Sequence, residues 1–294
     1  MERLLIIDGH SYAYRAFHAI RELNSPSGQP TNAIYGFIKM VAKLMGSVSP
    51  THWIVVWDGG LSAKRLAALP GYKAQRPEMP EPLRLQLDEI MEYLHAARIA
   101  SYCRDGIEAD DAIACIARRA ENGGLTAIIA SSDKDFMQLV SPRVGLLNPH
   151  DKTDVIWAAE QVRAKTGVEP GQIVDWLSLI GDTVDNIPGV PGVGPKTATD
   201  LLKQFRSIEE LFGRLDEVKS ARVRSALLAA KEAVLRNREL IRLHEVSCEF
   251  SPEEIAVKSP DTARLARLYE RLGFKTLLAA VKEAASRDCQ ALLI

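Results

Sequence analysis

Acidic residues follow short apolar runs of the chain in three places. Such runs predict strands that are buried on both faces of a parallel sheet. Ligands bind outside the carboxyl ends of these strands, so carboxylates that follow them are expected to share one pocket. The runs and their acids are Leu4–Ile7 with Asp8, Trp53–Trp57 with Asp58, and Thr126–Ala130 with Asp133 and Asp135.

Two further acidic groups extend this set, Glu108 with Asp110 and Asp111, and Asp182 with Asp185. So much like charge in one place is unfavourable unless divalent cations neutralise it. Carboxylate oxygens suit Mg²⁺ or Mn²⁺, and a pair of such ions catalyses phosphodiester hydrolysis. The residues therefore predict a two-metal nuclease site. Simpler roles stay open at this point, because a single aspartate after a strand is more often a turn residue or a helix cap.

Charge is unevenly distributed along the chain, although the net charge is only −1. Residues 105–185 carry a net charge of −7, whereas residues 61–85 carry +3 and residues 189–242 carry +4. An acidic centre between two basic flanks suits metal ions in the middle and phosphates on either side. Solvated helix faces would give the same pattern.

The bulk composition fits an ordinary globular protein, with 294 residues, 47% hydrophobic and 26% charged. We expect neither a signal peptide nor a membrane span, because no apolar stretch is long enough. The cysteines and histidines lack ligand spacing, which argues against structural zinc and favours reduced thiols in a cytoplasmic protein. The cysteines are Cys103, Cys115, Cys248 and Cys289.

Periodicity divides the chain into two parts. Residues 1–166 alternate strand-like and helical patterns, which predicts an α/β sheet flanked by helices, with clear amphipathic helices at 33–45 and 83–97. Residues 167–294 are predicted to form a helical domain, after a Gly and a Pro break the pattern at 166–171. Its expected helices are 173–181, 195–205, 208–215, 218–233 and 263–272.

Two segments fit neither pattern. Residues 59–82 form a long basic excursion directly after Asp58, which is typical of a loop that grips substrate over an active site. Residues 187–198 contain a glycine-rich turn between two helical patterns, and the whole of 173–205 is predicted to be a helix–hairpin–helix. Such a turn brings backbone amides close to a phosphodiester and reads no base sequence. An ordinary tight turn between helices is the alternative.

At these motifs the chain resembles the bacterial 5′→3′ exonuclease/flap endonuclease family, which includes the amino-terminal 5′-nuclease domain of DNA polymerase I and free-standing relatives. The resemblance is collinear and covers nearly the whole chain. The matching motifs include Ile7-Asp8-Gly9, Tyr14–Ala19, Val56-Trp57-Asp58, Gly71–Pro77, Gly106–Asp111, Ser132–Asp135, Gly181–Gly189 and Glu270–Phe274.

The resemblance implies a PIN-like, mostly parallel sheet, a helical arch over about 59–97 and a helix–hairpin–helix subdomain. It also implies two Mg²⁺ ions, for which Mn²⁺ would substitute. The first set of ligands is Asp8, Asp58, Glu108 and Asp110. The second set is Asp133, Asp135 and Asp185, with Asp182 close by, and Asp111 matches an additional acidic position that would act through water.

Several other residues match positions that contact DNA in the family. Lys73 and Arg76 would act on the scissile phosphate, and Tyr72 would stack on the terminal base. Arg15 matches a phosphate contact, and Lys64 with Arg65 belongs to the arch. At the hairpin the matching residues are Gly189, Gly192, Gly194 and Lys196.

The chain departs from the usual family pattern at Lys64, Ser132 and Val184, and none of these changes removes a ligand. The implied activity is metal-dependent removal of nucleotides from 5′ ends and cleavage of 5′ flaps, giving 5′-phosphates, in primer removal during replication and repair. Two alternatives are a junction-binding module with degenerate catalysis and an RNA-cutting nuclease. The sequence leaves open the preference between exonuclease and flap cutting, the use of RNA–DNA hybrids, protein partners and K⁺ binding at the hairpin; we expect a monomer.

Overall fold

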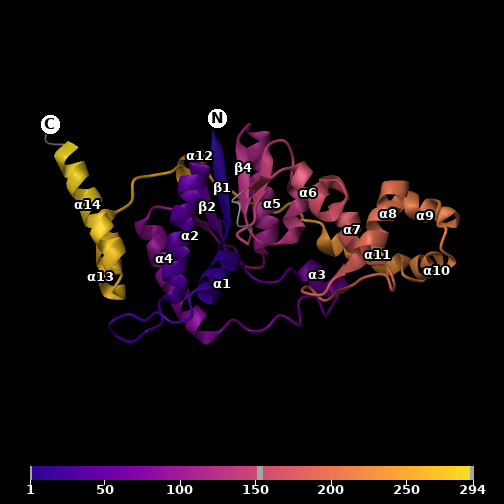
Figure 1. Cartoon of the computed structure of the whole chain (residues 1–294), viewed down its shortest axis with the longest axis horizontal. Helices are drawn as coiled ribbons and strands as arrows, with labels where there is room; N and C mark the ends of the chain where they lie inside the picture. Colours follow the sequence, from indigo (N-terminus) through magenta and orange to yellow (C-terminus); the bar gives the residue numbers. More distant parts are fainter. Residues whose placement is uncertain (1, 151–154, 292–294) are drawn as a thin grey trace. The chain divides into compact units, whose positions relative to one another are not determined.

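The computed structural model describes residues 2–150 and 155–291, and many of its elements are labelled in Figure 1. The described residues form two compact units, and each unit is assembled from separate stretches of chain. The first unit is drawn from Met1–Asp58, Glu78–Cys103 and Glu249–Ile294, and the second from Gly59–Pro77 and Arg104–Cys248. Each unit has strands and helices of its own.

The first unit contains parallel strands in the order β3 (Ala100–Tyr102), β2 (His52–Val56) and β1 (Arg3–Asp8). The side chains of β1 from Leu4 to Ile7 and those of β2 are buried. Both strands confirm the prediction from apolar runs. Strand β3 has no apolar run and is partly exposed, so the sequence did not predict it.

The helices of the first unit include the two that periodicity predicted, α2 and α4. The N-terminal turn of α2 lacks a capping side chain at Thr31, and its orphan amides are satisfied from α4 instead. The buried Gln86 accepts hydrogen bonds from the backbone of Ala33 at 2.8 Å and Ile34 at 3.2 Å. The helices are α1 (Gly9–Ala19), α2 (Asn32–Val48), α4 (Glu81–Ala96), α12 (Pro252–Ile255), α13 (Thr262–Leu272) and α14 (Lys275–Ala291).

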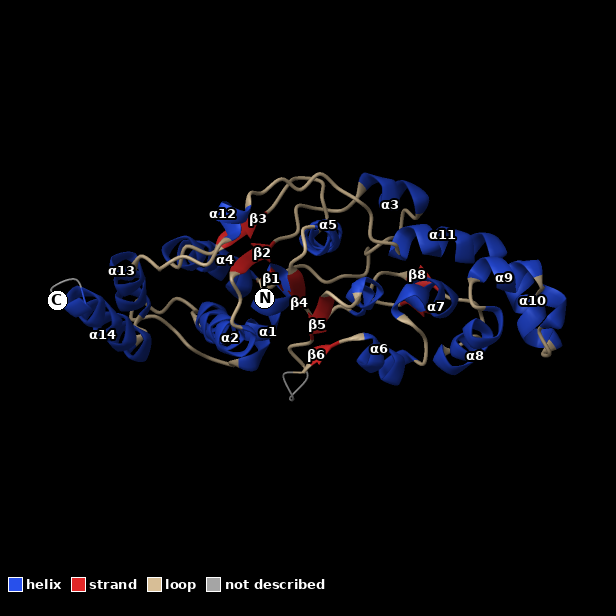
Figure 2. Ribbon diagram, turned by 90° about the horizontal axis from the view of Figure 1, so that it is seen from above, coloured by secondary structure: helices blue, strands red, loops and turns tan. Residues whose placement is uncertain are grey.

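The second unit also contains strands, and all strands are drawn in red in Figure 2. Strand β4 (Thr126–Ala130), which matches the third predicted apolar run, pairs in parallel with β5 (Val144–Leu147). Strand β6 (Ile156–Trp157) pairs with β5 in the antiparallel direction. A separate two-stranded hairpin joins β7 (Gly181–Asp182) to β8 (Ile187–Pro188).

Helices make up most of the second unit. One predicted helix, 218–233, is wrong, because the chain turns at Ala230 and forms two helices, α10 and α11. No Gly or Pro marks this break; the turn lets α11 pack on α7 and β8, and this tertiary packing overrides local pattern. The elements are α3 (Ala63–Ala68), α5 (Ala109–Asn122), η1 (Lys134–Leu139), α6 (Ala159–Thr166), η2 (Pro170–Gln172), α7 (Ile173–Ile180), α8 (Pro195–Phe205), α9 (Ile208–Gly213), η3 (Leu215–Glu217), α10 (Ala221–Ala229) and α11 (Lys231–Ile241).

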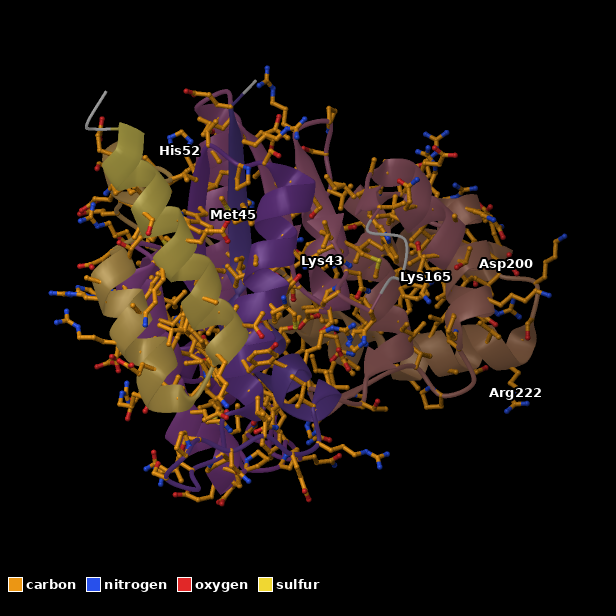
Figure 3. All side chains as sticks on the ribbon, turned by 60° about the vertical axis from the view of Figure 1, so that its left-hand side comes forward. Lys43, Met45, His52, Lys165, Asp200 and Arg222 are labelled. Atoms are coloured by element: carbon orange, nitrogen blue, oxygen red, sulfur yellow. The ribbon has the colours of Figure 1, made fainter. Side chains whose placement is uncertain are left out.

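Helices α7 and α8 flank the glycine-rich turn, as the sequence predicted. A chain of hydrogen bonds holds them together: Trp176 Nε1 donates to Thr199 Oγ1 at 3.0 Å, and Thr199 Oγ1 donates to the carbonyl of Thr166 at 2.8 Å. Asp200 on α8 and Arg222 on α10 are exposed and project from this region in Figure 3. The apolar side chains of Leu177, Leu201 and Leu202 are buried in this helix pair, as is the polar side chain of Thr199.

Two expectations from bulk composition can be compared with the described residues. Within them, no helix is both long enough and apolar enough to cross a bilayer. Cys103, Cys115 and Cys248 are free cysteines. The side chain of Cys289 lies outside the described part of the chain.

Gly189 is required by close packing in the hairpin, and its replacement by alanine tests this. A Cβ atom at Gly189 would lie 2.2 Å from the carbonyl oxygen of Ile180, whereas one at Gly194 would meet nothing within 4 Å. We expect Gly189→Ala to lower the free energy of unfolding by about 1–3 kcal/mol through overpacking. The matched Gly194→Ala should change it by less than about 0.5 kcal/mol. Urea denaturation of both variants measures this; equal stabilities would contradict the packing argument.

Candidate metal centre

Three carboxylates of the second unit converge to form the core of the site. Oxygen atoms of Asp135, Asp182 and Asp185 all lie within 4.8 Å of one another. Asp135 lies in the first turn of η1, which begins because Asp133 Oδ1 accepts a hydrogen bond from the backbone of Asp135 at 2.9 Å. The capping carboxylate thereby fixes where the second acid of the Asp-Lys-Asp motif lies.

The β7–β8 hairpin presents the other two acids. Asp182 ends β7 and accepts a hydrogen bond from the backbone of Val184 at 2.9 Å, which shapes the turn. Asn186 takes a left-handed conformation with φ of 56°, and its side chain donates to the carbonyl of Gly71 at 2.7 Å. Asp182 and Asp185 are both buried as a result.

The electrostatics of this cluster suit a divalent cation. Burial, and then the charges of Asp133, Asp110, Asp182 and Asp185, raise the pKa of Asp135 well above its ordinary value. Among the residues that the structure describes, the buried Oδ1 atom of Asp135 has no hydrogen-bond partner. Lys134 Nζ lies 3.0 Å from Asp182 and offsets part of the charge. An orphaned carboxylate oxygen beside two buried carboxylates fits the hard oxygen ligands that Mg²⁺ prefers.

Lys73 is a buried cation beside this cluster. Its Nζ atom contacts Glu108 Oε2 and lies 3.4 Å from Asp110 and 4.0 Å from Asp185. Its φ of 55° is left-handed, and its backbone N–H donates to the carbonyl of Asp185 at 3.0 Å. Burial opposes protonation of Lys73, but the nearby carboxylates outweigh burial and raise its pKa. Lys73 therefore remains a fixed positive charge among acids.

Glu108 is fully buried at the N-terminal cap of α5. Burial acts to raise its pKa, but Lys73 and Arg65 outweigh burial and hold that pKa below its ordinary value. Its Oε1 atom accepts from the backbone of Ser62 at 3.0 Å, and its Oε2 atom accepts from the Tyr72 hydroxyl at 3.1 Å. Glu108 therefore stays ionised in a closed polar network.

Arg76 extends from the same loop as Lys73 but keeps access to solvent. Its Nη2 atom donates to Asp185 Oδ1 at 2.6 Å, while 40% of the side chain is exposed. Burial opposes the charge of Arg76, and Asp185 outweighs it and raises the pKa. A planar guanidinium at the rim of a carboxylate cluster can reach a phosphate without leaving its partner.

The structure places Tyr72, Arg65 and Asp111 in the interior of the second unit, and the roles predicted for them stay predictions. The Tyr72 ring is only 3% exposed, and burial raises the pKa of its phenol. Arg65 and Asp111 form a buried bidentate pair at 2.7 and 2.8 Å. The reason is common to all three: the buried Glu108 and α5 draw this part of the excursion inward.

Asp8, Asp58 and Arg15 belong to the first unit. Asp8 ends β1 and caps α1 by accepting from the backbone of Ser11 at 3.0 Å. Asp58 follows β2, and its backbone N–H donates to His10 Nδ1 at 3.2 Å. Both acids thus lie at the carboxyl ends of neighbouring parallel strands, as predicted, and Arg15 lies on α1, half-buried.

The predicted hairpin contacts lie around the start of α8. Gly192 has a φ of 81°, which favours glycine, and Gly194 is the N-terminal cap residue of α8. Lys196, in the first turn, is exposed, as is Lys64 on α3. These placements leave backbone amides and positive charge open to an anion.

Two residues near the carboxylates were absent from the predicted site, Lys134 and Asn186. Lys134 lies between the two acids of the Asp-Lys-Asp motif, so its position near the carboxylates could have been predicted from the sequence. Asn186 shapes the hairpin through its left-handed backbone. Its side chain donates a hydrogen bond to the carbonyl of Gly71 and accepts one from Gln75 at 3.2 Å. No spacing rule reveals such a long-range contact.

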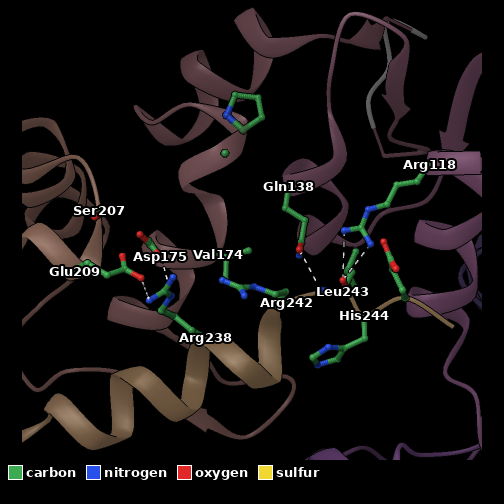
Figure 4. A pocket seen from close by; sticks show the side chains of 13 residues that line it. Arg118, Gln138, Val174, Asp175, Ser207, Glu209, Arg238, Arg242, Leu243 and His244 are labelled. Atoms are coloured by element: carbon green, nitrogen blue, oxygen red, sulfur yellow. Dashed lines mark hydrogen bonds and ion pairs between the residues drawn. The ribbon is translucent and has the colours of Figure 1, made fainter. Parts of the chain in front are cut away.

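A separate cavity of about 600 Å³ lies elsewhere in the second unit (Figure 4). Its charged lining is largely self-compensated: Arg238 pairs with Asp175 at 3.0 Å and with Glu209 at 2.5 Å. Gln138 and Arg118 also line it, and they donate to the carbonyls of Ile241, at the end of α11, and Leu243. The cavity shows no cluster of unbalanced charge.

Comparisons with known proteins give a consistent picture. Residues 3–167 match the family described as "5′-3′ exonuclease, N-terminal resolvase-like domain", and residues 168–263 match "5′-3′ exonuclease, C-terminal SAM fold". A 5′-3′ exonuclease of Aquifex aeolicus is 39% identical over 96% of both chains. DNA polymerase I of Bacillus caldotenax is 38% identical over 98% of this chain, which spans 33% of that polymerase.

Solved structures share the fold. A structure of phage T5 5′-exonuclease with bound zinc has a TM-score of 0.69 and 23% identity, covering 96% of this chain and 99% of that one. The catalytic core of Rad2 in complex with a DNA substrate has a TM-score of 0.67 and 16% identity, covering 95% and 92%. These matches confirm the predicted mostly parallel sheet with flanking helices, followed by a helical domain.

Removing the charge of Asp135 should have opposite effects without and with a divalent cation. Without metal, Asp135→Asn removes the repulsion between this carboxylate and its acidic neighbours. If the free energy of unfolding rises by about 1 kcal/mol, the unfolding temperature should rise by roughly 2–4 °C. With Mg²⁺, the wild type should gain stability by binding and the variant should lose most of that gain. Thermal unfolding in EDTA and in Mg²⁺ measures both effects. Asp200→Asn, an exposed change on α8, should alter neither; a variant that keeps the full Mg²⁺ gain would exclude Asp135 as a ligand.

Proposed function

Because this chain belongs to the 5′-3′ exonuclease family and is a phosphodiester-cleaving nuclease, we propose that it removes nucleotides from DNA 5′ ends and cleaves 5′ flaps with two divalent cations. The observation that carries the proposal is the cluster of Asp135, Asp182 and Asp185 with its orphaned buried oxygen. Mg²⁺ is the proposed ion, with Mn²⁺ able to substitute.

The proposed ligands follow the family resemblance. Asp133, Asp135 and Asp185, with Asp182, would hold one ion. Glu108 and Asp110, with Asp8 and Asp58 of the first unit, are assigned to the other. Bound there, the ions would supply an activated water and stabilise the in-line transition state.

Lys73 and Arg76 would stabilise and orient the scissile phosphate. Lys73 stays protonated because of the carboxylates around it and provides positive charge where negative charge develops. Arg76 is positioned by Asp185 and retains exposed N–H donors, so it can bind a non-bridging oxygen and orient the phosphate. Neither side chain needs to move far from its partner.

The hairpin would hold duplex DNA through its backbone. Gly192 and Gly194 leave room for a phosphodiester, and Lys196 adds charge at the start of α8. Lys64 on α3 would add a second, exposed contact. Such contacts read no bases, which suits an enzyme that recognises 5′ ends, flaps, junctions or RNA–DNA primer hybrids. K⁺ at the hairpin, a cytoplasmic location and a monomeric state stay predictions.

Cleavage of a 5′-labelled flap duplex, beside a blunt duplex, tests the function. Mg²⁺ should give product from the wild type, and EDTA should abolish it. Asp58→Asn and Asp133→Asn should lose cleavage and still bind the duplex in a gel-shift assay. Tight binding by the wild type with no product in Mg²⁺ or Mn²⁺ would instead indicate a junction-binding module.

Arg76→Ala tests the proposed phosphate contact. We expect kcat to fall by about 10²–10³-fold, the usual loss when one donor to a transition-state oxygen is removed. Duplex affinity should change little, because the hairpin contacts remain. Arg163→Ala, which removes an exposed arginine paired with Glu169 at 3.0 Å, is the matched control and should leave kcat unchanged. A kcat within about twofold of the wild type for Arg76→Ala would refute the role.

A further inference from the structure

Arg65 joins α3 to two other parts of the second unit through its side chain. A guanidinium has five N–H donors, and four of them donate hydrogen bonds here. Two go to Asp111 at 2.7 and 2.8 Å, and Nη1 also lies 3.1 Å from Glu108 Oε1. The other two go to the carbonyls of Leu240 at 2.9 Å and Arg242 at 3.1 Å, at the C-terminal end of α11. The side chain is only 3% exposed.

The backbone that follows α11 is held from two further elements. Asp111 Oδ1 accepts from the backbone of His244 at 2.8 Å. Gln138, at the end of η1, donates to the carbonyl of Ile241 at 3.1 Å and accepts from the backbone of Leu243 at 3.1 Å. Figure 4 shows Gln138 beside Leu243. The element that carries Asp135 is therefore bonded twice to this backbone.

Asn237 connects the same helix to the hairpin. This buried side chain donates from Nδ2 to the carbonyl of Ser178 at 3.2 Å and to that of Pro188 at 2.7 Å. Pro188 belongs to β8, which pairs with the β7 strand that ends in Asp182. The hairpin with Asp182 and Asp185 is thus tied to α11 by one amide group.

We propose that residues 237–244 form a brace that sets the spacing of the metal-binding carboxylates, with Arg65, Gln138 and Asn237 as positioning residues. The brace bonds separately to each acid-bearing element of the second unit: the start of α5 with Glu108, η1 with Asp135, and the β7–β8 hairpin. None of the three side chains is itself a metal ligand. The inference rests on the proposed function, because it concerns the ions that this site would hold.

The chemistry of metal sites makes such a brace necessary. Carboxylates that repel one another must be held within about 0.5 Å of the binding geometry before the ion arrives. Groups that orient the ligands typically contribute 10–100-fold to metal affinity. A brace of backbone carbonyls and amides can do this without adding charge to the cluster.

Metal affinity in the absence of DNA separates positioning from general stability. We would titrate the full chain with Mn²⁺ by calorimetry and measure the unfolding temperature of each variant. Arg65→Lys keeps the charge but supplies only three donors and no planar fork. Together with Gln138→Ala and Asn237→Ala, it should bind Mn²⁺ about 10–100-fold more weakly at a temperature where all remain folded.

Val234→Ala is the matched control, because Val234 is buried on α11 but lies outside residues 237–244. It should unfold at a lower temperature with unchanged Mn²⁺ affinity. If Gln138→Ala and Arg65→Lys bind Mn²⁺ as the wild type does, residues 237–244 have only a structural role and the inference is overturned. If the wild type itself binds no Mn²⁺, the proposed function fails, and the inference fails with it.

Discussion

Buried carboxylates repel one another, and in the second unit this repulsion is balanced by cations that the chain holds in place. Lys73 lies among Glu108, Asp110 and Asp185, Arg76 reaches Asp185, and Lys134 reaches Asp182. Breaking a buried ion pair by removing one partner leaves an uncompensated charge, which is strongly unfavourable. The position of the loop with Lys73 is therefore coupled to the acids themselves, and the excursion cannot be a freely moving loop at that point.

The basic excursion therefore contains both buried and exposed residues. Residues near Arg65 and Tyr72 are buried against Glu108 and serve the fold, while Lys64 and Arg76 remain exposed. All basic residues of the segment count equally in the sequence, but the structure buries two of them, Arg65 and Lys73, in internal ion pairs. Only the exposed ones would be open to DNA.

Much of the fold could be predicted because burial leaves a local signal. The apolar runs of β1, β2 and β4 and the periodic faces of α2 and α4 were all visible in the sequence. Strand β3 and the break at Ala230 were not, because each depends on a partner distant in sequence. The acids of the site could be found from their order and family motifs. Their partners could not: the Arg65–Asp111 pair joins residues that each resemble a ligand or a DNA contact when considered alone.

The discontinuous course of the chain also constrains how the protein folds. In the first unit, Val257 donates its backbone N–H to the carbonyl of Thr51, and Asp261 donates to the carbonyl of Ala96. These contacts join residues that are far apart in the sequence, and closing such long loops slows folding. During synthesis, β1 and β2 emerge early but must wait for the final quarter of the chain before these contacts can form. The second unit, most of which is the continuous stretch Arg104–Cys248, can gather earlier. A truncation after Cys248 would therefore leave β2, which is synthesised early, without its contact to the segment around Val257, which is synthesised late.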